Sequence, residues 1–296
     1  MLDELALQMP FLHRATCDAK SVPIAQRLSA LQSIGERLSQ IYDGDDWIRE
    51  SVRSYVYLSL EFLRLQRELE KTGAYLMSTE AETAQHVYDN ADVFGGYYLP
   101  GLLLTEALWP NHFVLNTAFL NRFVEGLPPN PAILEVGVGT GYHLSQLLDR
   151  RESARYVGLD ISEYAIDFCR RYAGVDHASS SSATFRLESI TGDCALPEKS
   201  FDGIVIGEVL EHIETPFDVM VDLRRAAKPG ATLFMTTVAF AANIDHIYMF
   251  ESVEEIRDLV QQSGWTIEAD WPLPVYPQDT PDMARRPMNY GAVLKN

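Results

Sequence analysis

The chain has 296 residues and a formal net charge of −18, from 42 acidic and 24 basic residues. Binding to nucleic acid or to an anionic membrane needs a surface rich in lysine and arginine, so this balance argues against both partners. A hydrophobic fraction of 47% and a charged fraction of 22% are those of a folded protein and exclude a wholly disordered chain.

The cysteines and the apolar runs bear on where the protein resides. Three widely spaced cysteines argue against a disulfide framework or a structural zinc site and favour a reducing compartment. The first residues lack the basic and long apolar regions of a signal peptide, and no uncharged apolar run is long enough to span a membrane. We therefore expect a cytoplasmic protein.

The first 90 or so residues carry helix signals and no strand signal. Residues 24–42 and 47–71 repeat apolar side chains at spacings of three and four, which places them on one face of a helix. Thr79 and Glu82 have the spacing of a capping box that opens a third helix. The aromatic stretch 93–127 could be a lid, helical packing or an oligomer interface. We expect a helical region over residues 1–127 that caps a pocket, forms a homodimer, or both.

The pattern changes at the proline-rich break 128–131. Short apolar runs then alternate with helical stretches, which predicts a parallel α/β sheet with crossover helices over residues 128–296. The expected strands are 132–137, 155–160, 183–189, 201–207 and 231–237, and the expected helices are 141–150, 162–172, 208–227 and 252–263. Strand-like stretches also occur at 265–271 and 289–295. The predicted fold is α/β, a doubly wound Rossmann-like sheet preceded by an all-helical region.

The strongest local signal lies between the first expected strand and the helix after it. Glu135, Gly137, Gly139 and Gly141 stand at every second position there. Glycines let a ligand approach the backbone closely, and the helix N-terminus supplies oriented N–H donors. Asp160 ends the next strand, where an acid can accept hydrogen bonds from two ribose hydroxyls. These features predict a nucleoside-containing cofactor at the carboxyl ends of the strands.

The glycine-rich stretch also distinguishes between cofactors. Tyr142 stands where the NAD fingerprint has a third glycine or alanine, which disfavours an NAD-linked oxidoreductase. The form E-x-G-x-G-x-G resembles motif I of the class I S-adenosylmethionine-dependent methyltransferases, and the similarity continues in the family's order from about residue 128 to 296. The resemblance implies S-adenosylmethionine as cofactor. It implies cofactor contacts at Glu135, Gly137, Gly139, Gly141, Asp160, Ile161, Asp193, Cys194 and Glu208. It also places Lys228, Pro229 and Gly230 in the turn before strand five.

Two histidines are candidate bases, because an imidazole near its ordinary pKa suits proton transfer at neutral pH. His212 ends the motif after strand four and is the first candidate; His246 is the second. In similar enzymes the segment before motif I covers the cofactor and contributes to the substrate pocket. We accordingly predict substrate contacts at Tyr97, Tyr98 and His112, and at Phe240 and Tyr248 after strand five.

These residues predict a methyltransferase that acts on a small neutral or cationic molecule, by O- or N-methylation in secondary metabolism, without a metal. One alternative is a metal-dependent methyltransferase, since carboxylates and imidazoles can share one divalent ion. Its ligands would be Glu208, Glu211, His212 and His246. Another alternative is a non-catalytic partner protein that binds S-adenosylmethionine.

Overall fold

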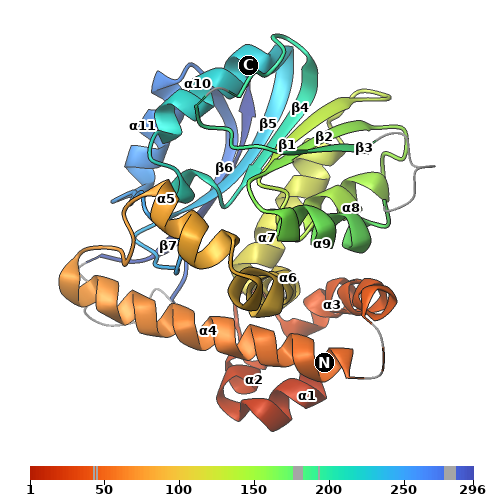
Figure 1. The fold of residues 1–296 in the computed structure, drawn as a ribbon, viewed down its shortest axis with the longest axis vertical. Helices are drawn as coiled ribbons and strands as arrows, with labels where there is room; N and C mark the ends of the chain where they lie inside the picture. The colour runs from red at the N-terminus through yellow and green to blue at the C-terminus, as the bar shows by residue number, and fades with distance from the viewer. Residues whose placement is uncertain (43, 45, 176–182, 193, 277–284) are drawn as a thin grey trace.

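A computed structural model describes residues 1–42, 44, 46–175, 183–192, 194–276 and 285–296. Within them a seven-stranded sheet has the order β3-β2-β1-β4-β5-β7-β6. Helices cover the sheet, and the N-terminal helices form a layer below it (Figure 1). The strands are β1 Ala132–Val136, β2 Arg155–Asp160, β3 Ala183–Leu187, β4 Phe201–Gly207, β5 Ala227–Ala239, β6 Thr266–Pro274 and β7 Met288–Lys295. None of the described helices is both long and apolar enough to cross a membrane.

The chain order reverses beside β1, whose neighbours are β2 and β4. In a doubly wound sheet a ligand binds at the carboxyl ends of the strands on either side of this reversal. The sheet is not wholly parallel as predicted, because β7 pairs antiparallel with both β5 and β6. This hairpin closes the edge of the sheet beyond β5, so the crevice at β1 and β4 remains its topological switch point.

The helices of the sheet region are α8 Tyr142–Leu148, α9 Glu163–Ala173, α10 Pro216–Ala226 and α11 Val253–Gln262. The predicted helix 208–227 is wrong over its first part, where only the short 3₁₀ turn η4 Leu210–His212 forms before α10. Pro216 opens α10 because proline lacks the N–H that an interior helical position must donate. Residues 208–215 are thereby free to present side chains at the end of β4. The expected turn 228–230 lies within β5.

The N-terminal region is helical throughout its described part. Its elements are α1 Leu2–Gln8, α2 Pro10–Cys17, α3 Ile24–Ile41, α4 Trp47–Thr72, α5 Glu80–Thr83, η1 Ala84–Tyr88, η2 Ala91–Tyr98, α6 Leu99–Leu108, α7 Pro110–Ala118 and η3 Phe119–Val124. Of the readings open for stretch 93–127, the structure shows helical packing, through η2, α6, α7 and η3.

Two buried clusters join the helices to the sheet region. One packs α3, α4 and α6 against Tyr142, Phe168 and Tyr172 of α8 and α9. The other packs Phe119 and Phe123 of η3 against Phe234 of β5. The helical layer is thus anchored at two places, and the space between the anchors lies over the carboxyl ends of β1 and β4. The division of the chain at residue 127 and the homodimer stay predictions.

Candidate functional site

The glycine-rich loop after β1 has the backbone conformation that its sequence predicts. Gly141, with a φ of 73°, precedes α8, and a Cβ there would lie 2.8 Å from the Cα of Cys169. Gly139, with a φ of 44°, has open space where a Cβ would project. Both positions favour glycine, Gly141 for packing and Gly139 for a clear approach to the backbone. The loop is therefore shaped to receive a ligand against its main chain.

Asp160 faces this loop from the end of β2. Its two carboxylate oxygens accept hydrogen bonds from the backbone N–H groups of Ser162 (2.9 Å) and Gly139 (3.1 Å). Burial raises the pKa of Asp160 to about 6, although these backbone donors act in the opposite direction. A carboxylate offers about four acceptor positions, so the backbone donors do not use all of them, and Asp160 lines the cavity.

Glu135 supports the loop from β1. Its carboxylate accepts a 2.6 Å hydrogen bond from the Tyr156 hydroxyl and lies 3.6 Å from Nδ1 of His143. Burial by itself would lower the pKa of His143, but Glu135 outweighs it and leaves the pKa raised. Sequence reasoning missed His143, because a histidine one position into a helix carries no signal of its own.

Glu208 stands where β4 ends, at the floor of the crevice. Its φ of 51° is unusual for a non-glycine residue, and its N–H donates to the carbonyl oxygen of Thr236 at 2.9 Å. Burial, followed by the charge of Glu211, raises the pKa of Glu208 to about 8. Glu208 is therefore largely protonated at neutral pH and can donate a hydrogen bond into the crevice.

His212 and His246 meet beside the same floor, with ring centroids 5.0 Å apart. Their loops are held by Asp245, whose buried carboxylate accepts hydrogen bonds from Tyr98 (2.8 Å) and Tyr88 (3.2 Å). Tyr88 and Tyr98 belong to η1 and η2, so the helical layer fixes the loop after β5. The predicted pair of histidines is thus brought together; their role as bases stays a prediction.

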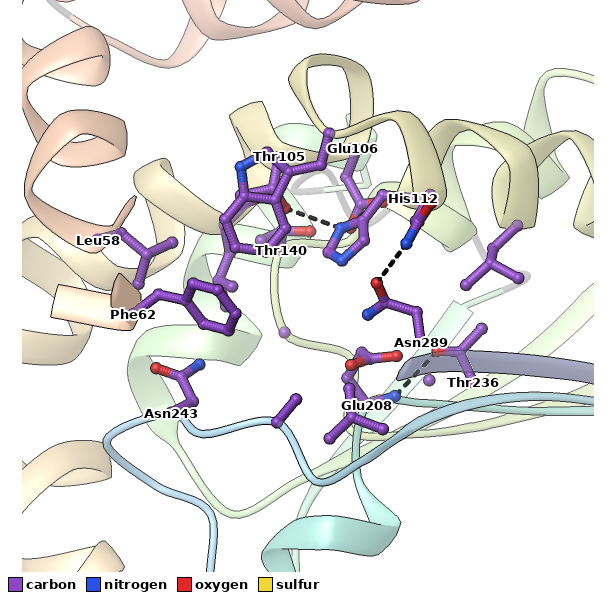
Figure 2. Close-up of a pocket in the computed structure, with 18 of the residues that line it drawn as sticks. Leu58, Phe62, Thr105, Glu106, His112, Thr140, Glu208, Thr236, Asn243 and Asn289 are labelled. Atoms are coloured by element: carbon purple, nitrogen blue, oxygen red, sulfur yellow. Dashed lines mark hydrogen bonds and ion pairs between the residues drawn. The ribbon is translucent and has the colours of Figure 1, made fainter. Parts of the chain in front are cut away.

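A cavity of about 1120 Å³ connects these groups with the helical layer. Small-molecule sites usually measure about 300–1,000 Å³, so this space exceeds what a single small ligand needs. Figure 2 shows Leu58 and Phe62 on the side of the helices, with Glu208 and Thr236 at the floor. The cavity therefore has a sheet side, formed by the ends of β1, β2 and β4, and a helical side that is largely apolar.

Hydrogen bonds fix the polar side chains of the helical wall. His112 points into the cavity (Figure 2), and its Nδ1 lies 3.0 Å from the hydroxyl oxygen of Thr105. Asn111 donates to the side-chain oxygen of Asn289 at 3.0 Å, which ties α7 to β7. Glu106 accepts a 2.7 Å hydrogen bond from Asn116. These contacts hold a set of oriented polar groups opposite the glycine-rich loop.

The predicted substrate residues divide into two groups. Tyr98 and His112 line the cavity, and their contact with a substrate stays a prediction. The described lining residues do not include Tyr97, Phe240 and Tyr248. These three side chains therefore do not form the wall of the cavity. Tyr97 donates a hydrogen bond to Glu61 at 2.9 Å, Phe240 packs against α4, and Tyr248 packs on Phe250. Each of these side chains thus makes its hydrogen bond or packing contact outside the cavity wall.

The predicted cofactor residues mostly converge. Glu135, Gly137, Gly139, Asp160, Ile161 and Glu208 line the cavity. Gly141 lies beneath the loop and packs on Cys169 instead. Cys194 packs against the core and is not one of the described lining residues, and Asp193 lies outside the described residues. The loop and the ends of β2 and β4 thus bring most of the predicted cofactor residues to one cavity; their contacts with a cofactor stay predictions.

Several lining residues were not predicted, among them Phe62, Thr105, Glu106, Asn111 and Asn289. Glu106 had a usable signal, because it is the single acid within the apolar run 93–110. A lone carboxylate in such a run must either face solvent or find a polar site. The remaining unpredicted residues occur in ordinary helical or strand patterns. Such a pattern predicts which face of an element is apolar, but it does not predict which face borders a cavity.

Comparison with known proteins decides the family of this site. Residues 134–235, which run from β1 into β5, match the family model described as a methyltransferase domain. The chain carries a class I S-adenosylmethionine-dependent methyltransferase domain. The cofactor of this methyltransferase domain is S-adenosylmethionine.

Relatives that match part of this chain are named for different substrates. The chain is 36% identical over 110 residues to a ubiquinone biosynthesis O-methyltransferase of Hahella chejuensis, covering 37% of this chain and 44% of the relative. It is 32% identical over 108 residues to a tRNA U34 carboxymethyltransferase of Pseudoalteromonas translucida, covering 36% and 31%. The match thus spans less than half the length of either relative.

Among solved structures, the [4+2]-cyclase SpnF is similar with a TM-score of 0.51 and 13% identity, over 64% of this chain and 82% of that one. At this identity the likeness shows the fold alone.

The residues present fit the cofactor of this methyltransferase domain. Gly139 leaves open space above its backbone, and Asp160 presents unused lone pairs from the end of β2. Ile161 is partly exposed beside Asp160 and offers an apolar surface to a base. A nucleoside lies across such a loop with its ribose at the acid, as in other doubly wound sheets.

Proposed function

We propose that this protein transfers the methyl group of S-adenosylmethionine to a small molecule enclosed between the sheet and the helical layer. The observation that carries the proposal is the cavity itself, which runs from the glycine-rich loop to an apolar wall of α4, α6 and α7. Its volume of about 1120 Å³ leaves room for a second molecule beside a nucleoside cofactor. A cavity that was filled by the protein's own side chains would instead have favoured a non-catalytic partner protein.

The charges of the lining favour a neutral or cationic acceptor. Among the described lining residues Lys20 is the only lysine or arginine, whereas Asp18, Glu106 and Asp245 contribute carboxyl groups outside the ribose site. An anionic acceptor would have to be buried beside these groups without a counter-ion, at a high cost in free energy. An RNA substrate is disfavoured for the same reason, and also by the net charge of −18.

The reaction needs alignment, exclusion of water and, for a protonated nucleophile, a base. When bound, S-adenosylmethionine supplies a methyl group on an already good leaving group. Asp160 and the glycine-rich loop hold and orient the cofactor, while Leu58, Phe62 and Trp109 exclude water from the acceptor side. The protein's remaining task is to receive the proton that the nucleophile loses.

His112 is the base that the geometry favours. The Thr105 hydroxyl donates its hydrogen to the carbonyl oxygen of Leu102 at 2.6 Å, so Thr105 can only accept from Nδ1 of His112. This arrangement places the hydrogen of the neutral imidazole on Nδ1 and leaves a lone pair on Nε2. Figure 2 shows the ring of His112 reaching into the cavity above Glu208, where an acceptor would lie.

Methyl transfer is tested with trideuteromethyl-labelled S-adenosylmethionine and pairs of small molecules that share one apolar body. Each pair carries either an amine or phenol, or a carboxylate. We expect labelled products from the amine or phenol members and not from the carboxylates, as read by mass spectrometry. Calorimetry should also show binding of S-adenosylhomocysteine but not of NAD. Binding of NAD without S-adenosylhomocysteine would overturn the proposal.

Replacement of His112 by glutamine is expected to lower kcat/KM by about 10²–10⁴-fold for a phenol acceptor, the usual contribution of a general base. Affinity for S-adenosylhomocysteine should be unchanged, because His112 belongs to the opposite wall. His86→Gln, at an exposed position of η1, is the matched control. Equal turnover by H112Q and H86Q would remove His112 from this role.

A further inference from the structure

Glu211 carries a buried carboxylate oxygen without a partner. Its side chain is fully buried, and Oε2 accepts a 2.7 Å hydrogen bond from the Thr237 hydroxyl. Oε1 has no hydrogen-bond partner among the described residues. A buried polar atom left unpaired costs free energy, so such an atom in a folded protein calls for an occupant that the structure does not contain.

The imidazoles of His212 and His246 lie beside Glu211. A backbone carbonyl oxygen fixes which nitrogen of each ring carries the hydrogen. Nδ1 of His212 lies 2.9 Å from the carbonyl oxygen of Asp245, and Nδ1 of His246 lies 2.8 Å from that of Ala241. Because a carbonyl oxygen only accepts, each Nδ1 carries the hydrogen and each Nε2 keeps a lone pair. Metal-binding histidines show this arrangement, in which the second nitrogen donates to a carbonyl or carboxylate.

Donor atoms of the three residues lie close together. Nε2 of His212 is 4.0 Å from Oε1 of Glu211, and one donor atom from each of Glu211, His212 and His246 falls within 4.8 Å of the others. Donors around a tetrahedral zinc ion are about 3.3 Å apart, given bonds of about 2.0–2.1 Å. Small side-chain rotations would therefore close the cluster on an ion.

We propose that Glu211, His212 and His246 bind one divalent transition-metal ion at the floor of the cavity. Two nitrogens and one oxygen suit Zn²⁺ or Co²⁺ better than Mg²⁺, which prefers an all-oxygen shell. His212 and His246 line the cavity, so a further coordination position faces the acceptor. An ion in an open site can bind a hydroxyl group and lower its pKa. This role in turnover rests on the proposed function, whereas ion binding does not.

The proposal changes two expectations from the sequence. His212 and His246 become ligands instead of bases. Glu208, expected as a fourth ligand, is not part of the three-residue cluster. The competing occupants of the space beside Oε1 are a water molecule and a proton shared with Glu208.

The test uses full-length protein without a histidine tag, stripped with a chelator and desalted. Titration with Co²⁺ should give ligand-field absorption that saturates at one equivalent and disappears when Zn²⁺ is added. Glu211→Gln and His246→Gln should each weaken affinity by at least about 100-fold, since loss of even an outer partner costs 10–100-fold. His112→Gln, in the same cavity but outside the cluster, should bind the ion as the wild type does.

Thermal unfolding gives a second measurement that needs no variant. Zn²⁺ at about 100 times its Kd should raise the melting temperature by roughly 4 °C. Binding well below one equivalent, or equal binding by wild type and both ligand variants, would overturn the site and favour water or a proton. Ion binding without methyl transfer would reject the proposed function alone. Methyl transfer by stripped protein that binds no ion would reject the metal site alone.

Discussion

Replacement of Asp160 by alanine is expected to weaken binding of S-adenosylhomocysteine by about 100-fold, or about 2.7 kcal/mol. A hydrogen bond to a charged group contributes about 1.5–3 kcal/mol, and the carboxylate can accept two from a ribose. Asp160→Asn keeps one acceptor and should lose about tenfold. Asp167→Asn, at an exposed position on α9, is the matched control. Calorimetry at pH 7.5 measures all three.

The same residue gives the binding a pH dependence. Because the pKa of Asp160 is raised to about 6, the affinity of wild type for S-adenosylhomocysteine should fall as the pH drops from 7 to 5. The limit is about tenfold per pH unit. Without cofactor, the stability of the folded protein depends on pH in the opposite direction. The folded protein binds more protons than the unfolded chain between about pH 4 and 6, so ionisation of Asp160 lowers stability as the pH rises.

Neither pH effect should remain in Asp160→Asn, which has no carboxyl group to titrate at this position. If the affinity of wild type is constant from pH 5 to 7, or if D160N binds S-adenosylhomocysteine as tightly as wild type, the ribose contact is assigned to the wrong residue.

Arg27→Met is expected to destabilise the protein by at least about 3 kcal/mol, which lowers the melting temperature by at least roughly 5 °C. Arg27 is fully buried, and its guanidinium donates to the carbonyl oxygens of Val22, Ala107, Leu108 and Thr16. Methionine has a similar length and cannot donate, so those four oxygens lose their donor. Two of them, on Ala107 and Leu108, belong to the last turn of α6.

The control for Arg27 is Arg37→Met on the same helix, α3. Arg37 pairs with Asp149 at 2.7 Å near the surface, where an ion pair contributes about 0–1 kcal/mol. Denaturant titrations followed by far-ultraviolet circular dichroism compare the two variants. Equal midpoints would mean that water replaces the guanidinium at the four carbonyls.

The sheet region was largely predictable, because each of its signals is local. The alternation of apolar strands and helices and the place of Asp160 at the end of the second strand are visible in the sequence, and the structure has both as predicted. The 208–227 helix failed because Pro216 was overlooked as a start signal. The antiparallel β7 depends on a long-range pairing that its own residues do not specify.

The acceptor side was less predictable, because it depends on how the helical layer lies on the sheet. Tyr98 and Phe240 are both aromatic, but η2 directs Tyr98 to Asp245 and the cavity, whereas Phe240 packs against α4. The free Oε1 of Glu211 and the fixed hydrogens on two imidazoles appear only once carbonyl groups of the loop after β5 are in place. No residue pattern along the chain contains that information.

The cavity draws its two sides from different parts of the chain. The cofactor side comes mainly from residues 135–212, within the stretch that matches the methyltransferase domain model, and most of the opposite wall comes from residues 12–116, outside it. Substrate choice and methyl donation can therefore diverge separately during evolution. We expect substitutions at wall residues such as Phe62 or Asn111 to change which acceptor is used, because they leave the cofactor side of the cavity unchanged.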